Sequence, residues 1–237
     1  MTHGVRLAVW SGPRNISTAL MRSWGSRPDT TVVDEPLYAF YLQTTGLDHP
    51  GREEVIAAGE TSWEAVVEVL TAPCKGVFYQ KHMAHNIIAD LPREWISSLT
   101  NVLLVRDPHE VVASYVKTRN RVVASDIGLV QQARLYDELD VAPPVIDARD
   151  FLGDPEGYLR FLCDYIGVEF MDSMLRWEPG PRPTDGVWAP YWYRSVHSSS
   201  GFEPYRERSV QLEGAALRAA RESEPFYEKL HGVRVVL

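Results

Sequence analysis

The sequence predicts an α/β fold in which a mostly parallel central sheet lies between two layers of helices, giving three layers. Short runs rich in Val, Leu and aromatic residues alternate with longer segments whose apolar residues recur with helical period, and this alternation is typical of βα units. A chain of 237 residues has the length of one such domain. No repeat, low-complexity tract or linker divides it, so we expect a single domain over residues 1–237.

The elements follow in order along the chain. The short apolar runs predict strands at 5–10, 31–34, 76–80, 102–105 and 145–147. Segments of helical period predict helices at 17–26, 62–70, 110–117, 126–139, 155–166 and 210–230. The stretch 178–202 breaks the alternation, because its Gly, Pro, Trp, Tyr and Ser residues show no clear period. We expect a long ordered loop there, and long loops in compact domains are often functional.

Composition and charge exclude several classes of protein. Hydrophobic residues make up 45% and charged residues 24%, which is typical of a globular protein and excludes disorder, collagen and coiled coil. The net charge of −8 argues against a nucleic-acid partner, so any anion site must be local. Two cysteines, Cys74 and Cys163, are too few for a disulfide framework. With no apolar run of ~20 residues and no secretory signal, we expect a cytoplasmic protein without a membrane partner.

The first strand leads into the segment SGPRNISTALMRSW, which has the features of an anion site. Gly12 gives a sharp exit from the strand, Asn15 is a candidate N-cap, and Ser17 and Thr18 lie in the first helical turn. The unpaired N–H groups of a helix N-terminus and its dipole attract anions, and Arg14 adds a planar cationic donor. This geometry suits a phosphate or a sulfate. The alternative is a capped helix beside a solvated arginine.

A second motif, VLLVRDPHEVVASY, follows the same plan at the fourth expected strand. The strand ends at Arg106, Asp107 and Pro108 open a helix, and Ser114 lies two turns into it. An arginine at a strand end and a hydroxyl on the helix that doubles back beside it can hold one phosphate from two sides. The alternative is an Asp-Pro helix start with an incidental arginine.

Together the two motifs resemble the PAPS-dependent sulfotransferases, which have a P-loop NTPase-like fold. GPRNIST is similar to the loop of that family that binds the phosphosulfate of 3′-phosphoadenosine 5′-phosphosulfate (PAPS), and the resemblance gives this role to Arg14, Asn15, Ser17 and Thr18. Arg106 and the serine eight residues later match the family's 3′-phosphate motif, and VIDARDFLGDPEGYLRFLCDYIGVEF resembles a later strand-turn-helix segment. The resemblance implies PAPS as co-substrate and no metal ion.

The sequence departs from that family where the adenine would bind. Ile16 stands where the family usually has Gly, and Ala19 stands where cytosolic members have a Trp that stacks on adenine. We therefore expect adenine to contact Trp24 or an aromatic residue of the 185–202 loop. That loop occupies the place of the family's C-terminal nucleotide loop, which makes Arg194 a weaker candidate for the 3′-phosphate.

Two residues compete as the general base that takes the proton of the acceptor. Glu35 follows the second strand, where ligands bind in open α/β sheets, and it resembles the glutamate base of heparan and tyrosylprotein sulfotransferases. His82 ends the third strand beside Lys81, as in the Lys-Thr-His element of cytosolic sulfotransferases, although here the two residues are adjacent. Lys81 is also a candidate at the bridging oxygen of the leaving group, with His85 as the imidazole that turns inward. We rank Glu35 first and expect Glu35 and His82 to line one cleft.

The sequence therefore predicts a sulfotransferase that moves a sulfuryl group from PAPS to a hydroxyl or amine of a small molecule by in-line transfer. A P-loop kinase is the first alternative, but GxxxxGK[ST] is absent. A non-catalytic nucleotide-binding module is the second. His82 and His85 lack companions at metal-ligand spacing, so we predict no metal site. Aromatic residues in 36–46 and 177–193 suit either an apolar acceptor pocket or the core, and oligomeric state stays open.

Overall fold

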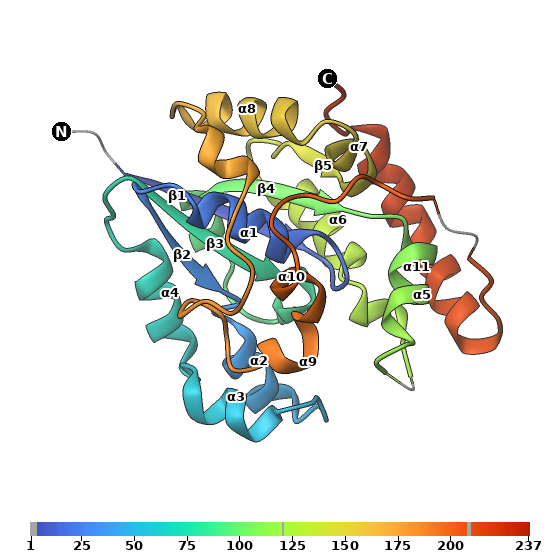
Figure 1. Ribbon diagram of the computed structural model, residues 1–237. Coiled ribbons are helices and arrows are strands. Elements are labelled where there is room, and N and C mark those ends of the chain that lie inside the picture. The colour runs from blue at the N-terminus through green and yellow to red at the C-terminus, as the bar shows by residue number, and fades with distance from the viewer. Residues whose placement is uncertain (1–3, 120, 208–209) are drawn as a thin grey trace.

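The computed structural model describes residues 4–119, 121–207 and 210–237, and it is built around one parallel sheet (Figure 1). The strands are β1 (Val5–Ser11), β2 (Thr30–Asp34), β3 (Val77–Met83), β4 (Thr100–Val105) and β5 (Val145–Asp147). They lie in the order β2-β3-β1-β4-β5, and every neighbouring pair is parallel. Helices cover both faces of this sheet. The α/β fold class and all five expected strands are thus confirmed.

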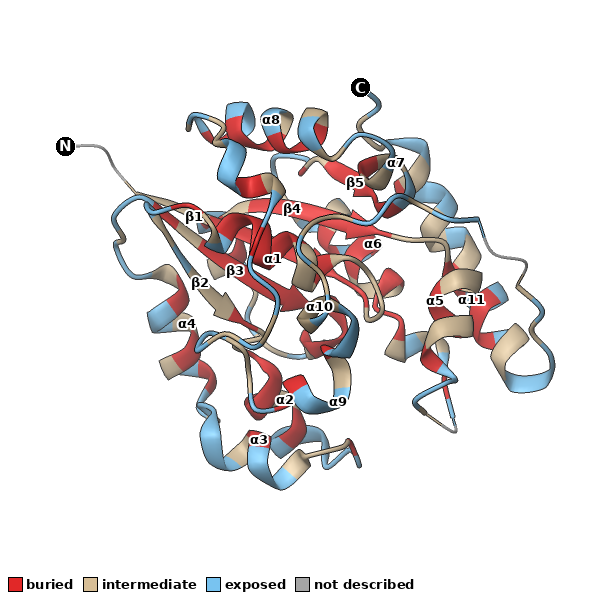
Figure 2. Cartoon of the chain, viewed as in Figure 1, coloured by how far each residue is buried: buried red, intermediate tan, exposed pale blue. Residues whose placement is uncertain are grey.

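Both faces of the sheet are buried because its strands are apolar on both sides. Leu7 and Val9 of β1 face a core formed with α1 (Ser17–Gly25), α7 (Ala148–Gly153) and α8 (Pro155–Ile166). Ala8 and Trp10 face the opposite core, formed with α4 (Trp63–Thr71), α5 (Pro108–Tyr115), α6 (Leu129–Glu138) and α11 (Gly214–Gly232). Figure 2 shows β1, β3, β4 and β5 largely buried between these two layers, whereas the edge strand β2 is only half-buried. The three-layer arrangement follows directly from this alternation.

All six expected helices are present. The helix expected at 155–166 matches α8 at both ends, the other five have shifted ends, and further helices were missed. The largest shift is in α11, which begins at Gly214 rather than at 210. The missed helices include α2 (Tyr38–Thr45) and α3 (Arg52–Ala58), which form a third apolar cluster with Trp188 and Tyr193. The sequence of α2 is YAFYLQTT, whose apolar residues surround the helix and leave no single stripe to recognise. Short 3₁₀ turns also occur at Ala84–Asn86, Glu94–Ser98, Ala124–Asp126 and Asp172–Leu175.

The expected loop at 178–202 is not entirely irregular, because it contains the one-turn helices α9 (Ala189–Trp192) and α10 (Arg194–His197). The segment is held against α1 by a buried ion pair in which Arg22 donates to both carboxylate oxygens of Asp185, at 2.6 and 2.7 Å. The backbone N–H of Gly186 donates to Asp34 at 3.1 Å. These polar contacts fix the segment over the carboxyl end of β2.

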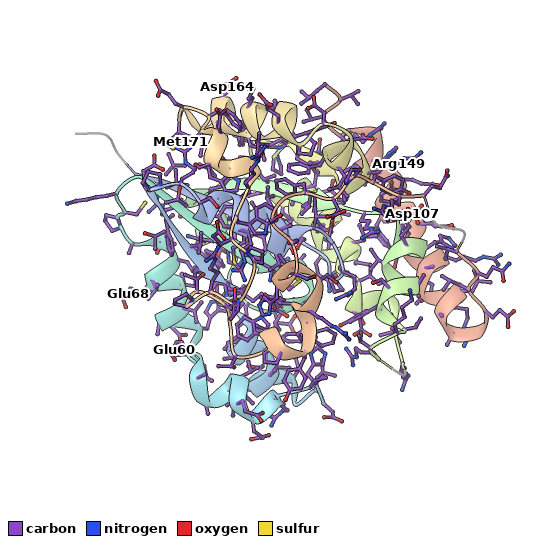
Figure 3. The ribbon with its side chains drawn as sticks, viewed as in Figure 1. Glu60, Glu68, Asp107, Arg149, Asp164 and Met171 are labelled. Atoms are coloured by element: carbon purple, nitrogen blue, oxygen red, sulfur yellow. The ribbon has the colours of Figure 1, made fainter. Side chains whose placement is uncertain are left out.

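The order of the strands decides where a ligand site can form. β1 lies between β3 and β4, so the chain that leaves β3 crosses β1 to reach β4. Connections therefore diverge at the carboxyl ends of β1 and β4, and open α/β sheets bind ligands at such a point. Asp107, labelled in Figure 3, caps α5 just beyond β4, its side chain accepting from His109 N at 2.7 Å. Within the described residues no helix is long and apolar enough to cross a membrane.

Candidate active site

A cavity of about 750 Å³ opens at the carboxyl ends of β1, β3 and β4. Its walls come from the β1–α1 connection, the ends of β2 and β3, helix α5 and the segments 192–206 and 210–212. Most of the site residues predicted from the sequence line this one cavity: Arg14, Asn15, Ser17, Thr18, Glu35, Lys81, His85, Arg106 and Ser114. The two motifs, separate in sequence, therefore belong to one site.

The β1–α1 connection is shaped to present backbone N–H groups to the cavity. A Cβ at Gly12 would lie 2.2 Å from the carbonyl oxygen of Ile127, so only glycine fits there. Asn15 does not cap α1 as expected. Instead its Nδ2 donates to Leu104 O at 3.0 Å, which ties the loop to β4, and its Oδ1 accepts from Ile16 N. Helix α1 has no side-chain cap, which leaves the N–H groups of its first turn available for an anion.

The arginines of the two motifs lie against each other. Arg14 has a left-handed backbone (φ 55°), and its Nε donates to Ser114 Oγ at 3.0 Å. Arg106 Nη1 donates to the backbone carbonyl of Arg14 at 2.9 Å, while its Nε and Nη2 bind the carboxylate of Glu110 at 2.9 and 2.7 Å. Burial and then the charge of Arg106 lower the pKa of Arg14. The cavity thus concentrates positive charge in a molecule that is acidic overall.

A buried polar cluster lies where β2 and β3 end. Lys81 Nζ donates to Asp34 at 2.8 Å, to Glu35 at 2.6 Å and to the hydroxyl of Tyr193 at 2.6 Å. That hydroxyl donates to Asp34 and accepts from Trp188 Nε1 at 3.0 Å. Burial lowers the pKa of Lys81, but the charges of Asp34 and Glu35 outweigh it and the net pKa is raised. Lys81 is therefore held as a cation inside the protein.

Glu35 stands at the boundary between this cluster and the cavity. Its side chain is 11% exposed and lines the cavity, while its left-handed backbone (φ 43°) is fixed by the bond from its N–H to Lys81 O at 2.9 Å. Burial raises the pKa of Glu35, the charge of Lys81 opposes part of that rise, and the charge of Asp34 adds to it. A carboxylate with a raised pKa is a better proton acceptor near neutral pH than an ordinary one.

His82 does not share the cavity with Glu35, contrary to expectation. Side chains alternate along β3, so while Lys81 faces the cavity, His82 faces the opposite core and stacks on Trp10 with ring centroids 4.0 Å apart. Burial, followed by the charge of Lys81, lowers the pKa of His82 to about 3. His85 turns inward as the alternative assignment expected and lines the cavity.

Two of the residues expected to contact the nucleotide, Trp24 and Arg194, lie outside the cavity lining. Trp24 is fully buried beneath the sheet, where it stacks on Tyr79 at 5.9 Å, so it does not reach the cavity. Arg194 is exposed at the start of α10, outside the cavity lining. Trp192, from the 185–202 loop, does line the cavity, as the aromatic alternative expected.

Several lining residues were missed by the sequence reasoning. Lys117, Tyr205 and Arg206 line the cavity but belong to no motif. Tyr205 donates to the Glu110 carboxylate, which is also the partner of Arg106. Only the fold brings 203–206 to α5, so spacing along the chain gave no signal for these residues.

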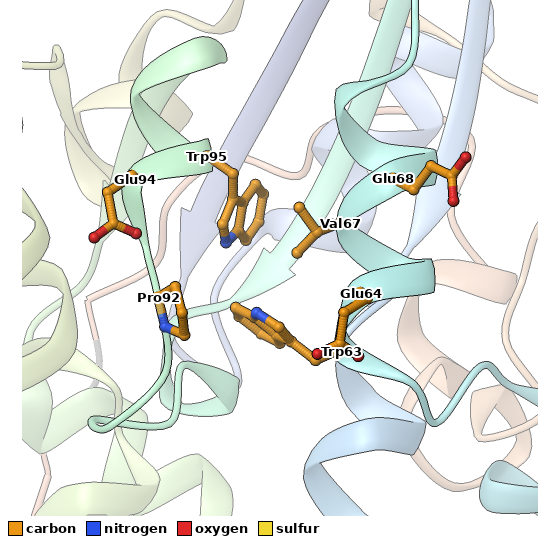
Figure 4. Close-up of a pocket in the computed structure, with 7 residues that line it drawn as sticks. All are labelled: Trp63, Glu64, Val67, Glu68, Pro92, Glu94 and Trp95. Atoms are coloured by element: carbon orange, nitrogen blue, oxygen red, sulfur yellow. The ribbon is translucent and has the colours of Figure 1, made fainter.

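A smaller apolar depression of about 440 Å³ lies between α4 and the Glu94–Ser98 turn (Figure 4). Trp63 and Trp95 form its floor with ring centroids 5.9 Å apart, and Glu64, Glu68 and Glu94 stand around it (Figure 4). It contains none of the predicted site residues. Among the described residues, no group of three or more His, Cys, Asp or Glu side chains is placed to hold a metal ion.

Comparison with known proteins identifies the family. The model of the sulfotransferase domain matches residues 5–232. The chain belongs to the sulfotransferase family. Two solved sulfotransferase domains share its fold. The domain of the Synechococcus PCC 7002 olefin synthase has a TM-score of 0.59 and 15% identity, and the match covers 94% of both chains. The domain of the curacin biosynthetic pathway has a TM-score of 0.50 and 16% identity, and the match covers 94% of this chain and 98% of the other. The resemblance drawn from the two motifs is thus confirmed.

Two curated relatives of this chain come from Arabidopsis thaliana. Branched-chain-amino-acid aminotransferase-like protein 1 is 42% identical over 198 residues, covering 81% of this chain and 36% of the relative. Protein 2 of that name is 39% identical over 199 residues, covering 82% and 35%. The chain therefore spans about a third of the length of these relatives.

Proposed function

We propose that this protein transfers the sulfuryl group of PAPS to a hydroxyl or amine of a small-molecule acceptor. The observation that carries the proposal is the meeting of the two anion-binding motifs in one cavity that Glu35 also lines. Arg14 and Ser114 are in direct contact, so a single nucleotide can touch both motifs. A carboxylate beside them supplies what the acceptor side of the reaction requires.

The donor would be held at two points. In this proposal, the first turn of α1 and Arg14 bind the phosphosulfate, since uncapped N–H groups and a guanidinium suit a tetrahedral anion. Arg106 and Ser114 bind the 3′-phosphate. Two nitrogens of Arg106 already converge on one anionic oxygen, Oε2 of Glu110, and a guanidinium of this kind also suits the oxygens of a phosphate. Trp192 is the proposed contact of the adenine.

The proposed reaction is an in-line transfer. The bond between sulfur and the bridging oxygen of PAPS breaks, a bond between sulfur and the acceptor oxygen or nitrogen forms, and Glu35 takes the acceptor proton. Charge that develops on the leaving phosphate is neutralised by Arg14 and the α1 N-terminus. Lys81 is assigned a positioning role, because it is 1% exposed and its ammonium is enclosed by Asp34, Glu35 and Tyr193. It keeps Glu35 ionised and fixes its orientation.

The alternatives of the sequence analysis fare differently. A P-loop kinase finds no support, because the Lys-Ser/Thr pair of its phosphate loop is absent. A non-catalytic nucleotide-binding module would use the same Arg14 and Arg106 contacts but would not need Glu35. The aminotransferase-like name of the relatives belongs to proteins of which this chain matches only 36%, and we assign no such activity to this chain.

The proposal is tested with sulfur-labelled PAPS and a panel of phenols, alcohols, sugars, hydroxy acids and amines. We expect wild-type protein to label at least one acceptor. Glu35→Gln should slow labelling by about 10²–10⁴-fold, while PAP, the nucleotide product of PAPS, still binds. Glu68→Gln is the matched control, because Glu68 is an exposed carboxylate on α4 that points away from the sheet (Figure 3). Binding of PAP without labelling of any acceptor would favour the non-catalytic module.

A further inference from the structure

Beside Glu35 the cavity wall carries a chain of hydrogen bonds that begins at a cation. Arg119 Nη1 lies 2.7 Å from Nε2 of His49, and Nδ1 of His49 lies 2.8 Å from the hydroxyl of Tyr38. The same Arg119 nitrogen donates to the hydroxyl of Tyr115 at 3.3 Å. His49, Tyr38 and Tyr115 all line the cavity, and each is less than a tenth exposed. Arg119 stands behind them, over the ring of Tyr115.

The chemistry of arginine fixes the direction of this chain. A guanidinium has donors only, so Nε2 of His49 must accept, and the ring proton must sit on Nδ1. Burial, followed by the charge of Arg119, lowers the pKa of His49 to about 4, which agrees with a neutral ring. Nδ1–H therefore donates to the oxygen of Tyr38. Because the oxygens of Tyr38 and Tyr115 both receive hydrogen bonds, the proton of each hydroxyl is left to donate elsewhere.

Charge around these two hydroxyls favours an anionic partner. Within the described part of the chain, no carboxylate lies at ion-pair distance from Arg119 or Lys117, although Asp126 acts on Arg119 from farther away. Lys117 lines the same cavity. Glu35, whose charge acts on both tyrosines, is already paired with Lys81. Two O–H donors backed by a guanidinium match the two oxygens of a carboxylate.

We infer that Tyr38 and Tyr115, oriented by Arg119 through His49, bind a carboxylate of the acceptor, so that the substrate is a hydroxy acid or an amino acid. This inference rests on the proposed function, because Glu35 is taken as the base. The charge of Glu35 acts on both tyrosines, which places the carboxylate clamp near the base. An acceptor whose carboxylate lies in this clamp, defined as Tyr38, Tyr115, His49 and Arg119, presents its own hydroxyl or amine to Glu35.

The experiment compares each acid with its methyl ester, which keeps the hydroxyl or amine and removes the charge. Glycolate, hydroxyphenylacetate, serine, threonine and tyrosine are assayed with PAPS beside their esters. We expect at least one acid to exceed its ester about tenfold or more in kcat/KM. Tyr38→Phe and Arg119→Ala should raise KM for that acid about tenfold and should raise KM for the ester much less, so that the preference for the acid is lost. Arg119→Lys, which keeps a cationic donor, should restore part of the preference.

Controls separate this inference from the proposed function. Tyr165→Phe is the matched variant, because Tyr165 is 40% exposed on α8. Calorimetry of the acids on PAP-saturated protein supplies a second readout that needs no turnover, and binding that Arg119→Ala abolishes would support the clamp.

The clamp would be overturned if esters were used as well as acids, or if the variants lost activity equally on acid and ester. Either result would leave the proposed sulfotransferase function standing. Acids that neither react nor bind to PAP-saturated protein would also overturn the clamp. Failure to bind PAP at all would overturn the proposed function.

Discussion

The guanidinium of Arg14 donates from Nε to the hydroxyl oxygen of Ser114 over 3.0 Å, joining residues 100 positions apart in sequence. Arg14 follows β1, whereas Ser114 lies near the end of α5, the helix that follows β4. The bond thus connects the two halves of the proposed donor site. We expect bound PAPS to insert its charged groups on either side of this contact.

Arg14→Ala should reduce turnover even at saturating PAPS, because positive charge at this point matters most as the bond to the leaving phosphate breaks. A loss of about 10²–10³ in kcat is expected, by comparison with removal of a single donor from an oxyanion site. Initial rates at saturating donor and acceptor measure it. Arg134→Ala is the control, because Arg134 is an exposed arginine on α6. Unchanged kcat would remove Arg14 from the mechanism.

Glu35 should set the acid limb of the pH–rate profile. Its pKa is raised by burial, and only the deprotonated carboxylate accepts a proton, so activity should be present above that raised pKa and fall as the pH drops through it. The inflection should therefore lie above 4.5, the ordinary value for glutamate. Rates measured between pH 5 and pH 9 test this. In Glu35→Gln the rate should fall about 10²–10⁴-fold. An acid limb that survives in the residual activity of Glu35→Gln would assign it to another group.

Asp34→Ala should lower the free energy of unfolding much more than the removal of an exposed carboxylate does. Asp34 accepts from Lys81, Tyr193 and Gly186, and its loss leaves a buried ammonium short of a partner. Removal of one member of a buried ion pair costs about 3–5 kcal/mol. Urea unfolding measures the change, and exposed Glu68→Ala should stay within about 0.5 kcal/mol of wild type. A small effect for Asp34→Ala would show that Glu35 alone can hold Lys81.

The buried histidines should make the protein sensitive to acid. Burial lowers the pKa of His82 and of His85 to about 3, whereas an unfolded histidine titrates at 6.5. Between these values the unfolded state binds more protons, so stability is fully present above pH 6.5 and falls as the pH drops toward 3. The two residues together contribute a slope of about 3 kcal/mol per pH unit near pH 5.

Urea unfolding at several pH values between 4.5 and 7.5 measures that slope. The double variant His82→Gln, His85→Gln should show a flatter dependence than wild type. An equally steep dependence in the variant would assign the acid sensitivity to carboxylates instead.

Local sequence was enough to predict the sheet and to place the two arginine motifs at one cavity. Each strand is a short apolar run. Arg106 follows β4 directly and Arg14 lies three positions beyond β1, so topology alone brings them to the same edge. The expectation for His82 was wrong because a shift of one residue along β3 moves a side chain to the opposite face. Trp24 was misplaced for a similar reason: it lies on the side of α1 that packs on Tyr79.

The remaining site residues depend on contacts between distant segments. Tyr193 reaches Lys81 across 112 positions, and Arg119 reaches His49 across 70. No periodicity or spacing encodes such pairs, since they form only after α2, α9 and the turn beyond α5 have packed together. The carboxylate clamp could therefore be recognised only from the structure.

The binding of PAP tests the central claim most directly, by calorimetry on wild type and Arg106→Ala with adenosine 5′-monophosphate as the companion ligand. Both nucleotides share the adenosine and a 5′-phosphate, but only PAP carries the 3′-phosphate assigned to Arg106 and Ser114. The account predicts that Arg106→Ala raises the Kd for PAP by about tenfold or more and leaves the Kd for the monophosphate nearly unchanged. Equal losses for the two nucleotides, or wild-type protein that binds neither, would contradict it.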